Sequence, residues 1–86
     1  MPEISRFFGI VVAMYYSDHP PPHFHARYGA HEIRLEINSG AILSGDFPAR
    51  ARRLVLDWLE KHRDELMEDW RLAGQHLPLK RINPLE

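Results

Sequence analysis

The order of hydrophobic and polar residues divides this chain into a strand-rich first half and a helical second half. Up to about residue 45, apolar residues form short β-branched and aromatic runs that end at glycine, proline or asparagine. Beyond it they recur every three or four positions. We therefore predict one α+β domain: an antiparallel β-meander of about four strands over residues 4–45, one long C-terminal helix over about 48–74 packed against it, and an extended tail over 75–86.

The first apolar run covers residues 7–16 and is rich in β-branched and aromatic side chains. Its apolar residues occupy both alternating positions, so we predict a strand that is covered on both faces or lies at the centre of the sheet. Gly9 within the run indicates a bulge or a kink. Residues 17–22 follow and contain three consecutive prolines, which predict a stiff loop that cannot be helical.

Two strictly alternating runs, residues 23–28 and 31–37, flank Gly29 and Ala30 and predict a β-hairpin with a type II′-like turn. A two-residue turn places Tyr28 opposite His31 and, five residues earlier, His23 opposite Glu36. One face of this hairpin is then apolar. The other face, the polar hairpin face, carries six residues: His23, His25, Arg27, Glu32, Arg34 and Glu36.

The second half predicts a helix that begins near Asp46-Phe47-Pro48, with Asp46 or a neighbour as its cap and Pro48 in its first turn. Gly74 is a candidate C-terminal cap. The predicted helix is long for a small domain, so we expect a break near residues 62–64. Its core-facing stripe consists of Ala51, Val55, Trp58, Leu59, His62, Leu66, Trp70 and Ala73.

Composition narrows the functional classes. The 86 residues suffice for one small domain, which would gain stability from a partner or from self-association as a homo-oligomer. Eleven basic and twelve acidic residues give a net charge of −1, so any nucleic-acid binding must use a local patch. The absence of cysteine excludes disulfides and thiolate metal sites. No signal-like start or bilayer-length apolar run is present, which predicts a cytoplasmic protein without membrane attachment.

The polar hairpin face supports a metal-site hypothesis. Residues two apart on a strand point the same way, so His23 and His25 in this His-x-His motif can share one metal ion. Glu36, opposite His23, is a candidate third ligand, and His19 or Asp18 from the proline loop a fourth. Imidazole and carboxylate suit a divalent transition metal such as zinc. Two half-exposed surface histidines without a metal are the alternative.

The same face also supports a metal-independent hypothesis, with no cofactor. A small ribonuclease needs an acid, a base and a cationic group at the phosphate. The candidate catalytic residues are His23, His25, Arg27, Arg34 and Glu36, and the two arginines beside the histidines count against a cation there. Tyr16 and Tyr28 are candidates for stacking on an RNA base, as is Tyr15. The alternative is a solvated face with cross-strand ion pairs.

The helix start carries the only dense basic cluster of the sequence, residues 50–53, which includes Arg53 as a candidate substrate-binding residue. Basic residues at a helix N-terminus are electrostatically unfavourable for the helix. The cluster is therefore a candidate nucleic-acid contact, with a solvated helix face as the alternative.

Several segments together carry a family resemblance: residues 2–10, Met14-Tyr15-Tyr16, Asp18-His19, the block Pro21-Pro22-His23-Phe24-His25-Ala26-Arg27-Tyr28-Gly29, and Pro84-Leu85. They resemble the small bacterial domain of unknown function 4160 family. The resemblance implies a small cytosolic protein encoded beside a cognate small protein, in a toxin–antitoxin-like module. It implies no catalytic residue. Two functional hypotheses follow: a toxin-like protein acting on RNA through the polar hairpin face, or a non-enzymatic module that binds a partner protein, with or without a histidine-bound metal.

Overall fold

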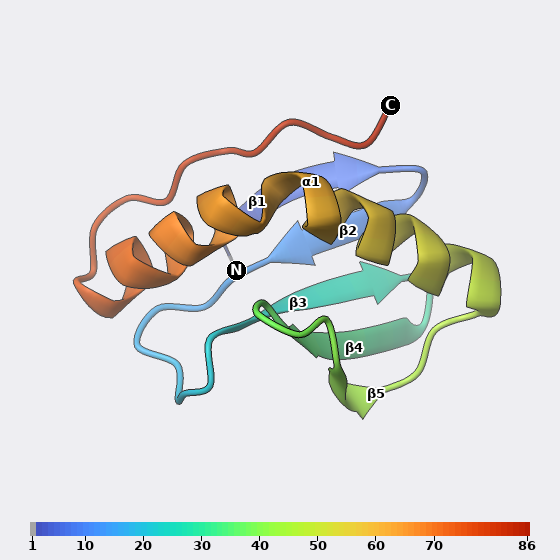
Figure 1. Cartoon of the computed structure of the whole chain (residues 1–86), viewed down its shortest axis with the longest axis horizontal. Helices are drawn as coiled ribbons and strands as arrows, with labels where there is room; N and C mark the ends of the chain where they lie inside the picture. The colour runs from blue at the N-terminus through green and yellow to red at the C-terminus, as the bar shows by residue number, and fades with distance from the viewer. Residues whose placement is uncertain (1) are drawn as a thin grey trace.

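The computed structural model describes residues 2–86 and has one antiparallel sheet with a single long helix across one face (Figure 1). The strands follow one another in space in chain order, each antiparallel to the next, which makes a meander. The α+β prediction is therefore confirmed. The elements are β1 (Glu3–Phe7), β2 (Ile10–Ala13), β3 (His23–Tyr28), β4 (His31–Glu36), β5 (Ile42–Gly45) and α1 (Ala49–Gly74).

The sheet has five strands where we expected about four, because the apolar run from residue 7 is not one strand. Phe8 and Gly9 both adopt positive φ angles, of 48° and 79°, and reverse the chain between β1 and β2. Gly9 thus lies in a tight turn, where glycine adopts positive φ without steric cost. The turn was hidden because Phe8, a bulky aromatic residue, is not a typical turn former.

The predicted register of the β3–β4 hairpin is confirmed at all six pairs, from His23 opposite Glu36 to Tyr28 opposite His31. Gly29 takes the positive φ (59°) that the first position of a type II′ turn requires. The apolar side chains of the two strands face the helix and are buried, except for Tyr28 at the end of β3. The strict alternation fixes this register, since a slip of one residue would expose the whole apolar set.

Trp58 occupies the centre of the core between α1 and the sheet, and its side chain is completely buried. Its ring lies 5.4 Å from the ring of Phe7 and 5.8 Å from that of Phe24, measured between centroids. The predicted break in the helix is confirmed at His62, whose φ of −126° and ψ of 22° are not helical. Within residues 2–86, no helix combines the length and the apolar character needed to cross a membrane.

The helix begins without the side-chain cap that we expected. Pro48 precedes Ala49 in an extended conformation, and no side chain of the described residues 2–86 caps the helix start with a hydrogen bond. The prediction that Asp46 caps the helix is therefore wrong, and Asp46 is exposed. Pro48 itself accepts the N–H of Arg52 through its backbone carbonyl, which starts the helical hydrogen bonds.

The tail from residue 75 runs back along α1 toward β1 (Figure 1). The N–H of Ile82 donates to the carbonyl of Ile4 (2.8 Å), and the Ile82 side chain is buried. The indole N–H of Trp58 donates to the carbonyl of Asn83 (2.8 Å). The tail also covers Asp69, which is fully buried on a helix face that the sequence alone left exposed.

Candidate metal centre

The proline-containing loop between β2 and β3 returns to the first residues of β3. It is anchored to the end of α1, because the N–H of Ser17 donates to the carbonyl of Ala73 (3.3 Å). This anchor places Asp18 beside the start of β3, where the polar hairpin face begins. The loop, the strand and the last turns of the helix therefore meet at one end of the molecule (Figure 1).

Asp18, His23 and His25 form a compact cluster at this end. The Oδ2 atom of Asp18 lies 2.9 Å from Nε2 of His23 and 3.4 Å from Nε2 of His25. One potential ligand atom from each residue lies within 4.8 Å of the other two. His23 is 2% exposed, while the side chains of His25 and Asp18 are 14% and 24% exposed. We refer to these three residues as the Asp–His–His cluster.

Hydrogen bonding fixes the orientation of the His23 ring. Its Nδ1 lies 2.7 Å from the backbone carbonyl oxygen of Pro21. A carbonyl oxygen only accepts, so Nδ1 carries a proton and donates it. In a neutral ring Nε2 is then an unprotonated acceptor, yet it faces the carboxylate of Asp18. With Asp18 ionised, the contact is attractive only if Nε2 also carries a proton or if both atoms bind one cation.

His25 repeats this arrangement with a side-chain acceptor. Its Nε2 faces Asp18, while its Nδ1 lies 3.7 Å from Oε2 of Glu32 on the neighbouring strand. The Nδ1 atom is buried and makes no hydrogen bond within residues 2–86. Both imidazoles therefore turn Nε2 toward one carboxylate oxygen and Nδ1 toward another oxygen acceptor.

The Asp18 carboxylate is held in its ionised form. Burial alone would raise its pKa, but the hydrogen bond from the His19 N–H and the interactions with His25 and His23 outweigh burial and lower the pKa. The His19 N–H donates to Oδ1 of Asp18 (2.9 Å), which leaves Oδ2 for the imidazoles. The cluster thus presents one anionic oxygen and two imidazole nitrogens at a common point.

An aromatic ring packs against each of the two imidazoles. Tyr15 meets His25 edge-on with ring centroids 4.4 Å apart, and Trp70 on α1 lies 5.3 Å from His23. A pocket of about 210 Å³ lies beside Asp18 between the loop and the helix end, lined by Tyr15, Asp18, Pro20, Trp70, Ala73 and Gly74. A small molecule can therefore reach the carboxylate from solvent.

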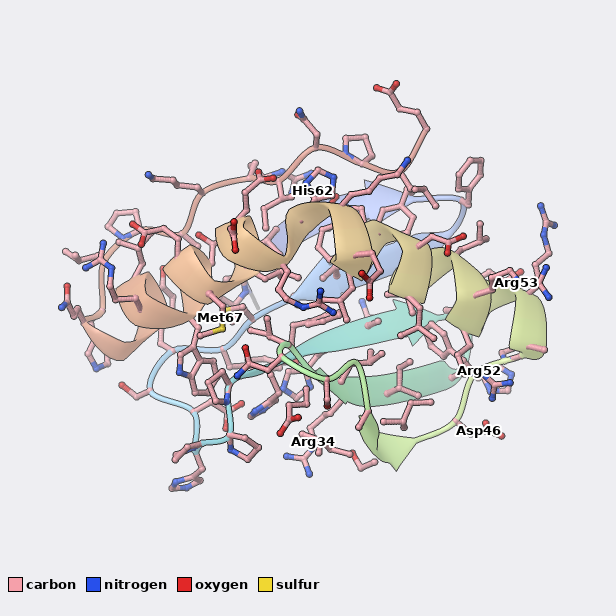
Figure 2. All side chains as sticks on the ribbon, viewed as in Figure 1. Arg34, Asp46, Arg52, Arg53, His62 and Met67 are labelled. Atoms are coloured by element: carbon pink, nitrogen blue, oxygen red, sulfur yellow. The ribbon has the colours of Figure 1, made fainter. Side chains whose placement is uncertain are left out.

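Arg27, Arg34 and Glu36 of the polar hairpin face are not drawn into this cluster, whereas Glu32 lies beside His25. Arg34 lies opposite His25 in the register but donates from Nε to Oγ of Ser44 on β5 (2.9 Å), and Figure 2 shows it at the lower edge of the molecule. Glu36 lies opposite His23, but its carboxylate accepts a hydrogen bond from the Ser39 hydroxyl. Arg27 is exposed further along β3. Of the expected metal ligands, His23 and His25 converge and Glu36 does not.

The three expected substrate-binding residues lie in two places. Tyr16 is exposed near the helix end, and its ring stacks on His76 with the two planes only 5° apart. Tyr28 and Arg53 lie at the opposite end, beside the start of α1, where Figure 2 shows Arg53 projecting from the molecule. One substrate would have to span the molecule to contact all three.

From the sequence, Asp18 was a candidate only for the fourth metal ligand, with His19 as the alternative. In the structure Asp18 is the central anion, and His19 contributes its backbone N–H while its side chain is exposed. No periodicity marks a loop residue as inward-facing. The available signal was chemical: Asp18 is the one carboxylate of the loop that leads into the two histidines.

Comparison with known proteins identifies the family and nothing more specific. The model of the family described as a domain of unknown function, DUF4160, matches residues 9–71. The chain therefore belongs to this family, as the resemblance predicted. The match includes the loop, the hairpin and most of α1, and hence the whole Asp–His–His cluster. No curated protein and no solved structure matches the chain.

Proposed function

We propose that this DUF4160 domain binds one divalent transition-metal ion, zinc in the first instance, between Asp18, His23 and His25. The observation that carries the proposal is the His23 ring, whose Nδ1–H donates to Pro21 while Nε2 faces Asp18 at 2.9 Å. When the His23 ring is neutral, Nε2 and the Asp18 oxygen are both acceptors and repel each other at this distance, and a cation bound by both atoms removes the repulsion. A carboxylate and two neutral imidazoles are a donor set that zinc and iron(II) accept.

The groups behind the three donors support the same proposal. Metal-binding histidines usually donate their second ring N–H to a carbonyl or a carboxylate, which fixes the ring and strengthens the ligand. Here Pro21 accepts from His23, Glu32 lies near Nδ1 of His25, and the His19 N–H donates to Asp18. Arg34 keeps its charge, but its Nε donates to Ser44 on β5, which lies on the other side of β4 from the two histidines.

Three protein donors leave at least one coordination position for water or another ligand, as in catalytic rather than structural zinc sites. A bound zinc ion supplies Lewis acidity and lowers the pKa of a coordinated water. The pocket beside Asp18 opens one side of the proposed site to solvent. We therefore propose a metal site open to an exogenous ligand rather than a purely structural ion.

The test is isothermal titration of tag-free, chelator-treated protein with zinc, with metal analysis of the protein as purified. We expect one site per chain, weakened at least 100-fold by Asp18→Asn and by His25→Gln, because each removes a ligand. Glu36→Gln removes the third ligand that was predicted from the sequence, which the structure does not bring to the cluster. This variant should bind zinc normally. His31→Gln, which changes an exposed histidine of the same hairpin, is the matched control. Normal zinc binding by Asp18→Asn would refute the proposal.

The toxin-like action on RNA and the cognate partner protein stay predictions. A metal-free ribonuclease mechanism has less geometric support than the metal site, because Arg34 and Glu36 are held by Ser44 and Ser39 instead of converging on the histidines. The toxin hypothesis predicts growth arrest on strong expression that His25→Ala abolishes. Normal growth, with no RNA cleavage in the presence or absence of zinc, would contradict it.

A further inference from the structure

A groove at the other end of the molecule is formed by three separate segments. It has a volume of about 210 Å³ and is bounded by the β1–β2 turn, the end of β3 and the first turns of α1. Its lining residues are Phe8, Tyr28, Pro48, Arg50, Ala51 and Leu54. We call it the Phe8–Tyr28 groove. It contains no member of the Asp–His–His cluster, so a ligand of this groove is independent of the proposed metal site.

Two aromatic rings of the groove face solvent. Phe8 lies in the β1–β2 turn and is 57% exposed. Tyr28 is 38% exposed, and its ring meets the buried Phe47 edge-on at 6.1 Å. Gly9 makes room for that ring, because a Cβ there would lie only 3.3 Å from Cε1 of Tyr28. Exposed aromatic rings are surfaces on which a planar group can stack.

Three exposed arginines, Arg50, Arg52 and Arg53, surround the start of α1, and Figure 2 shows two of them projecting from its first turns. Within the described residues 2–86, none of the three forms an ion pair. Arg6, Arg63, Arg71 and Arg81 are paired with glutamates, whereas Arg27 and Arg34 on the hairpin also form no ion pair within residues 2–86. The first turn of α1 contains no acidic residue. Asp46 and Asp57, the nearest carboxylates along the chain, leave these arginines unpaired.

We infer that the Phe8–Tyr28 groove binds single-stranded nucleic acid, with a base stacked on Phe8 or Tyr28 and the adjoining phosphates bound by Arg50, Arg52 and Arg53. Sequence-tolerant recognition of single strands combines aromatic stacking surfaces with a cationic track for the backbone, and both are present here. A duplex keeps its bases stacked on one another, so the protruding Phe8 ring cannot reach their faces. A net charge of −1 confines the attraction to this patch.

The experiment is fluorescence anisotropy with a short labelled RNA, a DNA of the same sequence, the corresponding duplex, and poly-glutamate as an unlabelled competitor. We expect both single strands to bind at low salt, and the duplex and poly-glutamate to bind at least tenfold more weakly. Tighter binding of RNA than of DNA supports contacts to the 2′-hydroxyl, and equal binding supports the shared stacking and phosphate chemistry. Equal binding of the duplex or of poly-glutamate would overturn the inference.

Matched variants locate the site. Replacing Arg50, Arg52 and Arg53 by glutamine should lower affinity at least tenfold and reduce the slope of log affinity against log salt by about 2, since each phosphate contact on a single strand contributes about 0.7. Phe8→Asn should lower affinity about fivefold or more, the lower end for one base stack. Arg71→Gln, a helix arginine paired with Glu68, should bind like the native protein. Native affinity in the triple variant, or an equal loss in Arg71→Gln, would contradict the site.

Discussion

The charged and aromatic residues at the two ends of this small domain differ in burial and in their polar contacts. At the end where the proline loop meets the last turns of α1, Asp18 and two imidazoles are largely buried and every ring nitrogen lies within 4 Å of an oxygen atom. At the end where α1 starts, three arginines are exposed and form no ion pair with any residue from 2 to 86, and two aromatic rings face solvent. Both ends meet β3, which runs from His23 at one to Tyr28 at the other.

This difference indicates two kinds of ligand. Buried donors that converge on one point suit a small cation, because each donor is already oriented and desolvated. Exposed charges around a shallow groove suit an extended anionic chain, because their attraction acts over distance and depends on salt. One strand thus connects a candidate ion site to a candidate polymer site, and each can be disrupted without the other.

The largest expected effect is a stabilisation of the domain by zinc that depends on the Asp–His–His cluster and not on the arginines at the start of α1. Free zinc at 100 times its dissociation constant should stabilise the native domain by about 2.7 kcal/mol, because it binds only the folded state. For a domain of this size, that raises the melting temperature by about 10–20 °C. Differential scanning fluorimetry should show the shift in native protein and in the triple arginine variant. Asp18→Asn should show almost none.

If the triple arginine variant also lost the zinc-dependent shift, the two ends would be coupled and the proposed independence would be wrong. The same titration with magnesium serves as a control for ionic strength. Magnesium prefers oxygen ligands and should leave the melting temperature of all three proteins nearly unchanged.

A smaller effect is expected at Asp69, which is a second buried carboxylate. Its pKa is raised, whereas that of Asp18 is lowered. Burial raises the pKa of Asp69, only partly offset by the hydrogen bond from the Lys80 N–H. Because the folded pKa exceeds the unfolded value, the native state binds this proton more tightly, and ionisation at neutral pH costs stability. Asp69→Asn should therefore raise the free energy of unfolding at pH 7 by about 1 kcal/mol.

The pH dependence provides the control for this prediction. As the pH falls through the folded pKa of Asp69, the native protein regains the stability lost by ionisation, so its difference from Asp69→Asn should shrink. Urea unfolding at several pH values measures both. A difference that stays constant from neutral to acidic pH would show that folding does not raise the pKa of Asp69.

The smallest expected effect concerns Phe8 at the groove end. Its φ of 48° is unfavourable for a bulky side chain, whereas asparagine adopts this conformation more readily. Phe8→Asn should therefore raise the free energy of unfolding by about 0.5 kcal/mol, even though it weakens nucleic-acid binding. Denaturant unfolding measured beside anisotropy checks both signs. A variant that loses stability as well as affinity would indicate that Phe8 supports the fold.

The sequence predicted the hairpin well because its information is periodic. Alternation from His23 onward fixed both the register and the two faces, and helical spacing fixed most of the core stripe of α1. The β1–β2 turn was missed because Phe8 and Gly9 lie within an apolar run in which no polar residue marks a turn. Asp69 was missed because the tail that buries it is distant in sequence and has no periodic pattern.

The candidate site was predictable only in part for a related physical reason. The shared direction of His23 and His25 follows from strand geometry, so the sequence alone suffices for it. The position of Asp18 depends on how a proline loop is anchored to the far end of α1 through Ser17 and Ala73. The loss of Glu36 and Arg34 from the site depends on local hydrogen bonds to Ser39 and Ser44, which register alone does not reveal.

Long-range ¹H–¹⁵N NMR of the histidine rings during zinc titration tests the central claim most directly, since it reports the protonation of each ring nitrogen. We predict that zinc shifts the Nε2 resonances of His23 and His25, while His23 keeps the Nδ1 proton that it donates to Pro21. His31 should be unaffected, and Asp18→Asn should abolish the shifts. A His23 ring that remains protonated on both nitrogens at saturating zinc would contradict the metal site and leave a buried imidazolium–carboxylate pair in its place.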